Sequence, residues 1–138
     1  MRPPLDEPEF SRWREEAGRA LGAATREATA ENHNWSCFLA EQAAQLAVKA
    51  LLHGLGRGPW GHDLERLLAA VGEAGVALND EVRAAARLLV RHYIPARYPD
   101  AQPAGAPGGR YVADDSLAAL EATDTLLRFV DETWESFG

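Results

Sequence analysis

The sequence predicts an all-α protein, an antiparallel four-helix bundle with an additional short helix. Apolar residues recur at helical spacing in several segments, and no segment shows the sustained alternation typical of a half-buried strand. Alanine, leucine, glutamate and arginine are abundant, whereas β-branched residues are sparse. Amphipathic helices joined by short connections pack as an antiparallel bundle. We expect residues 1–138 to form one domain, which is long enough to bury its own apolar core.

Two long helices are expected in the first half of the chain. The first runs from about residue 8 to residue 28, and residues 1–8 are expected to be flexible. The second runs from about residue 31 to residue 53, with an apolar stripe along its whole length. Gly54 and Gly56 end this helix, because glycine readily adopts the left-handed conformation found after helix C-termini.

Three further helices are expected in the second half. A short one runs from about residue 62 to residue 73. Asn79 or Asp80 caps the next, which continues to Tyr93 before Pro95 stops it. The last runs from about residue 115 to residue 136. Residues 101–112, which precede it, are rich in glycine and proline and are expected to be flexible.

The charge of the chain is unevenly distributed. The formal net charge of −7 argues against generic electrostatic binding to nucleic acid. Residues 82–110, however, hold five arginines and one aspartate, whereas residues 112–138 hold seven acidic residues and one arginine. A small basic region on an acidic body suits selective recognition of a short nucleotide segment, but not binding along a duplex.

Several classes of protein are disfavoured by composition. The single cysteine, Cys37, excludes a disulfide framework and a zinc site built from several cysteines. His33 and His53 lack partners at ligand spacing, so we expect no metal site, and we expect no cofactor. No apolar run approaches the roughly 20 residues that span a bilayer, and the N-terminus lacks the apolar segment of a signal peptide. We therefore expect a cytoplasmic protein that is not bound to a membrane.

Residues 87–100 carry the strongest functional signal. This segment holds three arginines, one histidine and two tyrosines within fourteen residues of an otherwise acidic chain. Arginine binds phosphate through paired N–H donors, and tyrosine offers a flat face on which a base can stack. We therefore expect a nucleotide or RNA site formed by this segment.

Three motifs, in this order and spacing, resemble the HEPN domain family. Residues 38–50 are similar to the family segment QQAAEKALKA, and residues 61–68 are similar to its H-x-L-x-x-L step. Residues 93–100 match its segment Y-x-P-x-R-Y-P-D. The resemblance extends over residues 10–137. One departure is Gln45, which stands where the family commonly has a glutamate, so that the ion pair with Lys49 four residues later is absent.

The resemblance implies an all-α bundle that is often dimeric and has one of two functions. Some HEPN proteins are small companions of a minimal nucleotidyltransferase, in a two-component pair that resembles a toxin–antitoxin system. We expect this role and a homodimer, with a nucleotide or RNA bound by Lys49, Tyr93, Arg97 and Tyr98, next to Arg87 and His92. Other HEPN proteins are metal-independent RNases whose active site lies where two protomers meet.

The RNase alternative depends on Arg87 and His92, which fit the R-x(4–6)-H pattern of those enzymes. An imidazole next to a guanidinium can move a proton and stabilise a phosphate in metal-free RNA cleavage. This hypothesis requires an accessible His92 on the same side as Arg87. The competing interpretation is a half-exposed histidine favoured by the helix C-terminus. A third alternative is a non-catalytic dimeric scaffold.

The other candidates also have structural interpretations. Arg97 and Asp100 can form an architectural ion pair, and Lys49 can be an ordinary solvated lysine. His62 can hydrogen bond a loop carbonyl at the start of a helix. Trp60, in a glycine–proline turn, can face a partner or shield His62.

Overall fold

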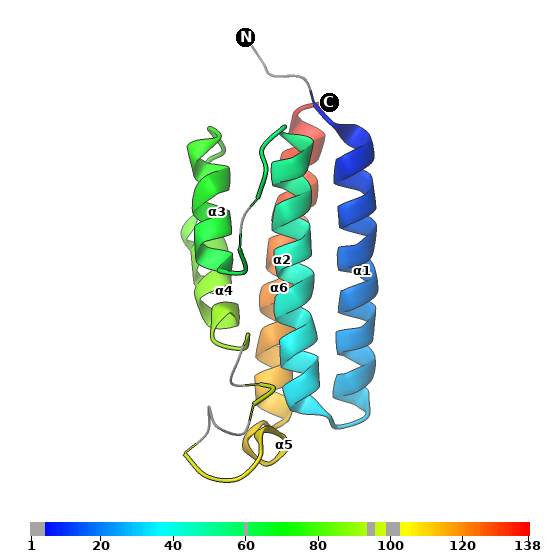
Figure 1. Cartoon of the computed structure of the whole chain (residues 1–138), viewed down its shortest axis with the longest axis vertical. Helices are drawn as coiled ribbons and strands as arrows, with labels where there is room; N and C mark the ends of the chain where they lie inside the picture. The colour runs from blue at the N-terminus through cyan, green and yellow to red at the C-terminus, as the bar shows by residue number, and fades with distance from the viewer. Residues whose placement is uncertain (1–4, 60, 94–95, 99–102) are drawn as a thin grey trace.

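The computed structural model describes residues 5–59, 61–93, 96–98 and 103–138. In these residues the only regular elements are helices, and their arrangement is drawn in Figure 1. The predicted all-α helical bundle is thereby confirmed. The helices are α1 (Glu7–Thr29), α2 (His33–Gly54), α3 (Leu64–Glu73), α4 (Asp80–Val90), α5 (Pro107–Arg110) and α6 (Ala113–Ser136).

Helix α2 is the central element of the bundle. It packs against α1 on one side, against α6 behind it in Figure 1, and against the shorter α3 and α4 on the other side. Its buried residues face all of these neighbours, and they include alanines that allow α1 to approach closely. At one end, the Phe10 ring of α1 stacks on the Trp134 ring of α6 with centroids 4.2 Å apart. Gly54 lies against Trp134, where a Cβ atom would clash with the indole.

Side chains at the helix N-termini explain where three helices begin. Asp6 accepts a hydrogen bond from the N–H of Glu9, at 3.1 Å, before α1. Asp63 caps α3 and Asn79 caps α4 in the same manner. These contacts satisfy N–H groups that lack a partner within their own helix.

The largest difference from the expected helix boundaries is at the end of α4. Helix α4 ends at Val90 instead of Tyr93, because the chain turns after Arg91 and the His92 ring packs inward. The proposed stop, Pro95, lies outside the described residues. Within the expected flexible segment 101–112, Pro107 begins the single turn of α5, since a proline fits the first position of a helix.

The last helix begins two residues earlier than expected, at Ala113. The carboxylate of Asp115 accepts a hydrogen bond of 2.8 Å from the N–H of Val112, which stabilises this earlier start. Across the part of the chain that the structure describes, no helix combines the length and apolar character that crossing a membrane requires.

Candidate functional site

Arg97 lies among three aromatic rings. Its guanidinium carbon is 4.3 Å from the ring centroid of Phe38, 4.9 Å from that of Tyr93 and 5.0 Å from that of Tyr98. Its Nε donates a hydrogen bond of 2.9 Å to the carbonyl of Tyr93. Guanidinium groups are attracted to ring faces at these distances, so the four residues hold one another in place. We call Phe38, Tyr93, Arg97 and Tyr98 the arginine–aromatic cluster.

Aromatic surface next to this cluster is open to solvent. Tyr98 is 49% exposed, and Trp35, one turn before Phe38 on α2, is 45% exposed. The Trp35 and Phe38 rings meet edge to face, with centroids 6.1 Å apart. Large exposed rings beside a cation are typical of surfaces on which nucleic-acid bases stack.

A buried carboxyl group lies beneath the cluster. Glu41, one turn after Phe38, is fully buried and accepts hydrogen bonds from the side-chain amides of Gln42 and Gln45. The amide oxygen of Gln45 is 3.3 Å from Nδ1 of His62. Since the amide nitrogen of Gln45 faces Glu41, its oxygen acts as the acceptor, and we place the proton of His62 on Nδ1.

His62 connects this chain of polar groups to the cluster. Its ring is stacked on that of Tyr93, with centroids 5.4 Å apart and planes 13° apart. We call Glu41, Gln45 and His62 the Glu41 network. The sequence suggested a hydrogen bond from His62 to a loop carbonyl, but its partner here is a side-chain amide.

The ionisation of Glu41 is strongly perturbed. Burial raises the pKa of its carboxyl from 4.5 to about 7, although the amides of Gln45 and Gln42 and the charges of Arg97 and Lys49 oppose the rise. Burial also lowers the pKa of Lys49, and the carboxyl of Glu41 counteracts that shift. Lys49 therefore lies within the electrostatic reach of the network, half-buried and not fully solvated.

The sequence pattern alone does not single out Glu41. The family segment QQAAEKALKA has a glutamine at the position of Glu41 and a glutamate at that of Gln45, so this chain exchanges the two. In this chain the carboxyl lies one turn before Gln45 and is hydrogen bonded to its side-chain amide. The available signal was a glutamate three residues after Phe38, on the buried face of an otherwise apolar helix.

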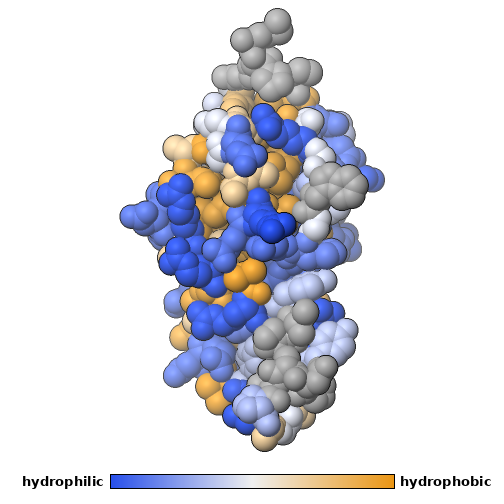
Figure 2. Space-filling view, turned by 60° about the vertical axis from the view of Figure 1, so that its left-hand side comes forward, coloured by the Kyte–Doolittle hydropathy of each residue, from blue (hydrophilic) through white to orange (hydrophobic). Residues whose placement is uncertain are grey.

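Arg87 and His92 have different environments. Arg87 is exposed on α4 and lines a groove of about 670 Å³ between α3 and α4, together with Glu65, Leu78 and Arg83. Figure 2 shows the face on which α3 and α4 lie, where hydrophilic side chains border hydrophobic areas. His92 is only 7% exposed, so the ring is neither accessible, as the RNase hypothesis requires, nor half-exposed, as in the competing interpretation.

His92 is paired inside the protein. Its Nδ1 is 3.0 Å from the hydroxyl of Tyr111, with which it shares a hydrogen bond. Burial, and to a smaller extent the charge of Arg91, lowers the pKa of His92 to about 4. The charge of Asp115 opposes this shift. The same burial raises the pKa of Tyr111 to about 12. His92 is therefore neutral at physiological pH.

A second contact holds the segment that carries Arg97. The side-chain amide of Asn34 donates a buried hydrogen bond of 3.0 Å to the carbonyl of Ala96. Together with the pair of His92 and Tyr111, this contact fixes the backbone next to Arg97 against α2. Asp100 and Trp60, which the sequence also singled out, lie outside the described residues.

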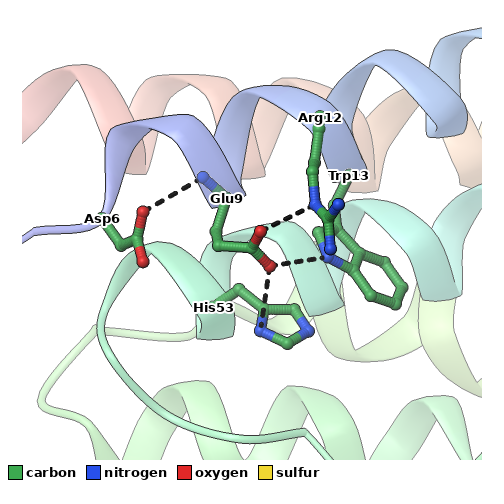
Figure 3. Close-up of polar contacts among 5 residues, drawn as sticks. All are labelled: Asp6, Glu9, Arg12, Trp13 and His53. Carbon is green, nitrogen blue, oxygen red and sulfur yellow. Dashed lines mark hydrogen bonds and ion pairs between the residues drawn. The ribbon is translucent and has the colours of Figure 1, made fainter.

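His53 belongs to a separate polar group at the other end of the bundle (Figure 3). Glu9 accepts one hydrogen bond from the indole N–H of Trp13 and forms an ion pair with Arg12. His53 stacks on Trp13 at 4.6 Å, and its Nδ1 lies 3.9 Å from Glu9. These contacts join α1 to α2. Within the described residues, no three histidine, cysteine, aspartate or glutamate side chains are grouped closely enough to hold a metal ion.

Comparison with protein families gives a match over most of the chain. The model of the HEPN domain matches residues 10–133. The chain belongs to the HEPN domain family. No curated protein matched it.

Solved structures similar to this chain have the same fold. TT1696 from Thermus thermophilus is 36% identical, with a TM-score of 0.86, over 89% of this chain and 96% of that one. ST0689, described as an archaeal HEPN homologue, is 28% identical, with a TM-score of 0.77, over 90% and 96%. An HEPN domain protein from Thermotoga maritima is 24% identical, with a TM-score of 0.74, over 90% and 98%, and supports the fold alone.

Proposed function

We propose that this HEPN protein is the nucleotide- or RNA-binding component of a two-component pair with a minimal nucleotidyltransferase. The observation that carries the proposal is the position of Arg97, within 5.0 Å of three aromatic ring centroids. A guanidinium held beside exposed rings can contact a phosphate while a base stacks alongside. The shared ligand chemistry is therefore a phosphate attached to a nucleoside.

Each residue of the cluster has a distinct part in this proposal. Arg97 contacts the phosphate, and Tyr98 and Trp35 offer their exposed faces to bases. Tyr93 and Phe38 are half-buried and hold Arg97 in position. Lys49 adds positive charge from the second helix. The acidic remainder of the chain disfavours long nucleic acids, so the ligand is a free nucleotide or a short single-stranded segment.

The partner and the assembly also belong to the proposal. The family resemblance supports a homodimer and a nucleotidyltransferase companion. The proposed cytoplasmic location rests instead on the single cysteine of the chain. Co-purification after joint expression with a candidate nucleotidyltransferase tests the pairing, and the mass of the purified complex tests the dimer. A monomer that never co-purifies with such an enzyme would contradict this part.

The endoribonuclease alternative has less support. Its proposed base, His92, is buried and bonded to Tyr111, whereas its proposed phosphate ligand, Arg87, is exposed on α4. A catalytic role would need the His92 ring to leave Tyr111 and reach a surface shared by two protomers. A scaffold without a ligand would leave the exposed Trp35 and Tyr98 beside Arg97 without a function.

Binding measurements with two probes test the proposal. ATP and a triadenylate without terminal phosphates distinguish a free nucleotide from a short RNA. Arg97→Gln removes the cation and should weaken binding of the preferred probe at least tenfold, as loss of a charged phosphate contact does. Arg128→Gln, which removes an exposed arginine of α6 paired only with Asp124 among the described residues, should bind as the wild type does. Equal affinity of both variants, or no binding by folded wild type, would refute the proposal.

A further inference from the structure

We propose that the arginine–aromatic cluster takes up a proton at Glu41 when it binds a phosphate-bearing ligand. The inference rests on the proposed function and adds a regulation by pH to the same site. The proton comes from the solvent and converts the carboxylate of Glu41 to the neutral acid. No bond of the ligand changes.

The position of Glu41 makes such coupling possible. Its carboxyl is fully buried one turn after Phe38, whose ring lies 4.3 Å from the guanidinium carbon of Arg97. Among the described residues its hydrogen-bond partners are the neutral amides of Gln42 and Gln45. Neither Arg97 nor Lys49 forms an ion pair with it within that part of the chain. Burial without contact to a cation raises the pKa of a carboxyl, so that such a group can gain a proton near neutral pH.

The charges around Glu41 can be named element by element. Arg97, after α4, and Lys49, on α2, are the charged groups that act on its carboxyl, and no charged group of α1, α3, α5 or α6 is among them in the described chain. His62, before α3, reaches it through the amide of Gln45, and Tyr93 stacks on His62. The balance between protonated and ionised Glu41 therefore depends on two cations.

A bound phosphate changes that balance. Both cations lower the pKa of Glu41, and an anion placed against them cancels part of their field. Its own negative charge also repels the carboxylate of Glu41, and the full burial of that carboxyl limits how far water screens the repulsion. The pKa of Glu41, already about 7 in the free protein, must therefore rise on binding. By linkage, the ligand binds more tightly where Glu41 is protonated, and its affinity falls as the pH rises above 7.

Calorimetry of ATP binding at pH 7.5 tests the inference. Titrations in two buffers of different ionisation enthalpy give the number of protons taken up per ligand. The terminal phosphate is then largely ionised, since the second pKa of a phosphate ester is about 6. We expect wild type to take up on the order of half a proton more than Glu41→Gln, which cannot titrate. Glu121→Gln, an exposed acid of α6, should match the wild type.

A second measurement needs no variant. In wild type, the affinity for ATP should fall by up to about tenfold per pH unit between pH 7 and 8.5. The carbon-13 signal of the Glu41 carboxyl should titrate at a higher pH with ATP bound than without it. These readouts apply even if Glu41→Gln fails to fold.

The outcomes distinguish proton uptake at Glu41 from the proposed binding of a nucleotide or RNA. Binding of ATP with equal proton uptake in wild type and Glu41→Gln, or an unchanged Glu41 titration, would overturn this inference and leave the proposed function standing. If ATP does not bind but triadenylate does, the same comparisons are made with triadenylate. No binding of either probe would overturn the proposed function, and this inference with it.

Discussion

The hydroxyl of Tyr111 and Nδ1 of His92 lie 3.0 Å apart and close the segment that carries Arg97. His92 follows α4 and Tyr111 precedes α6, so one side-chain contact joins the two ends of this segment. The histidine that would serve as a general base in an RNase thus has a structural partner. We expect this contact to hold the segment that carries Arg97 in place.

Tyr111→Phe tests that contact. The variant keeps the ring but removes the hydroxyl, which leaves a buried nitrogen of His92 without its partner. An unsatisfied buried polar group costs roughly 1–3 kcal/mol, so we expect the free energy of unfolding to fall by that amount. Urea denaturation at pH 7 measures the change. A variant as stable as wild type would show that the contact does not hold the segment.

Glu41→Gln should change how stability depends on pH. The pKa of Glu41 is raised to about 7 in the folded protein, so the folded chain keeps a proton that the unfolded chain releases near 4.5. The resulting stabilisation is complete below pH 4.5 and is lost as the pH rises to 7, with a total of roughly 3 kcal/mol. Between pH 4.5 and 8 the variant should therefore gain about this much relative to wild type in urea denaturation. A constant difference between the two proteins over this range would contradict a protonated Glu41.

His92→Asn should reveal the opposite dependence. The pKa of His92 is lowered to about 4 in the folded protein, whereas the unfolded chain binds a proton near 6.5. The resulting stabilisation is complete above pH 6.5 and is lost as the pH falls to 4, by roughly 3 kcal/mol. The wild type should lose this amount relative to the variant between pH 7 and 4. Parallel curves for the two proteins would mean that folding does not lower the pKa of His92.

The pH ranges in which Glu41 and His92 affect stability overlap between pH 4.5 and 6.5. In this range Glu41 makes the free energy of unfolding fall with rising pH, whereas His92 makes it rise. The contributions of Glu41 and His92 to the wild type should largely cancel there. Each substitution removes one of them and uncovers the other. A double variant should restore a nearly flat profile over this range.

An RNA cleavage assay distinguishes a binding protein from an endoribonuclease. We expect purified wild type to leave mixed total RNA intact in the presence of EDTA, because His92 is buried. His92→Ala should give the same result, and gel electrophoresis after prolonged incubation checks both. Cleavage by wild type that is lost in a folded His92→Ala would establish the endoribonuclease alternative instead.

The helical periodicity was enough to predict the fold. Helix α2 was expected to end near His53 and ends at Gly54, since the apolar stripe and the glycines act locally. For α4 the sequence predicts an end at Tyr93, three residues too late, because His92 turns inward to the distant Tyr111, which the sequence around Val90 does not indicate. Local patterns predict helices better than they predict contacts across the bundle.

The candidate site was predicted in part. Tyr93, Arg97 and Tyr98 lie together as their spacing suggested, with Phe38 added from a helix more than fifty residues earlier. The sequence does not distinguish Glu41 from other acidic residues, because an acidic residue on a helix is usually solvated. Only the burial of Glu41 in the folded structure sets it apart. The fold, and not the local sequence, creates its environment.

Nuclear magnetic resonance during titration with ATP and with triadenylate tests the central claim most directly. The account predicts that the Nε–H signal of Arg97 and the indole signal of Trp35 shift together as one of the two ligands is added. The indole of Trp13, stacked on His53 at the other end of the bundle, serves as an internal control and should stay unchanged. Shifts confined to the groove lined by Arg87, or no shift at Arg97 with either ligand, would contradict a nucleotide site at this cluster.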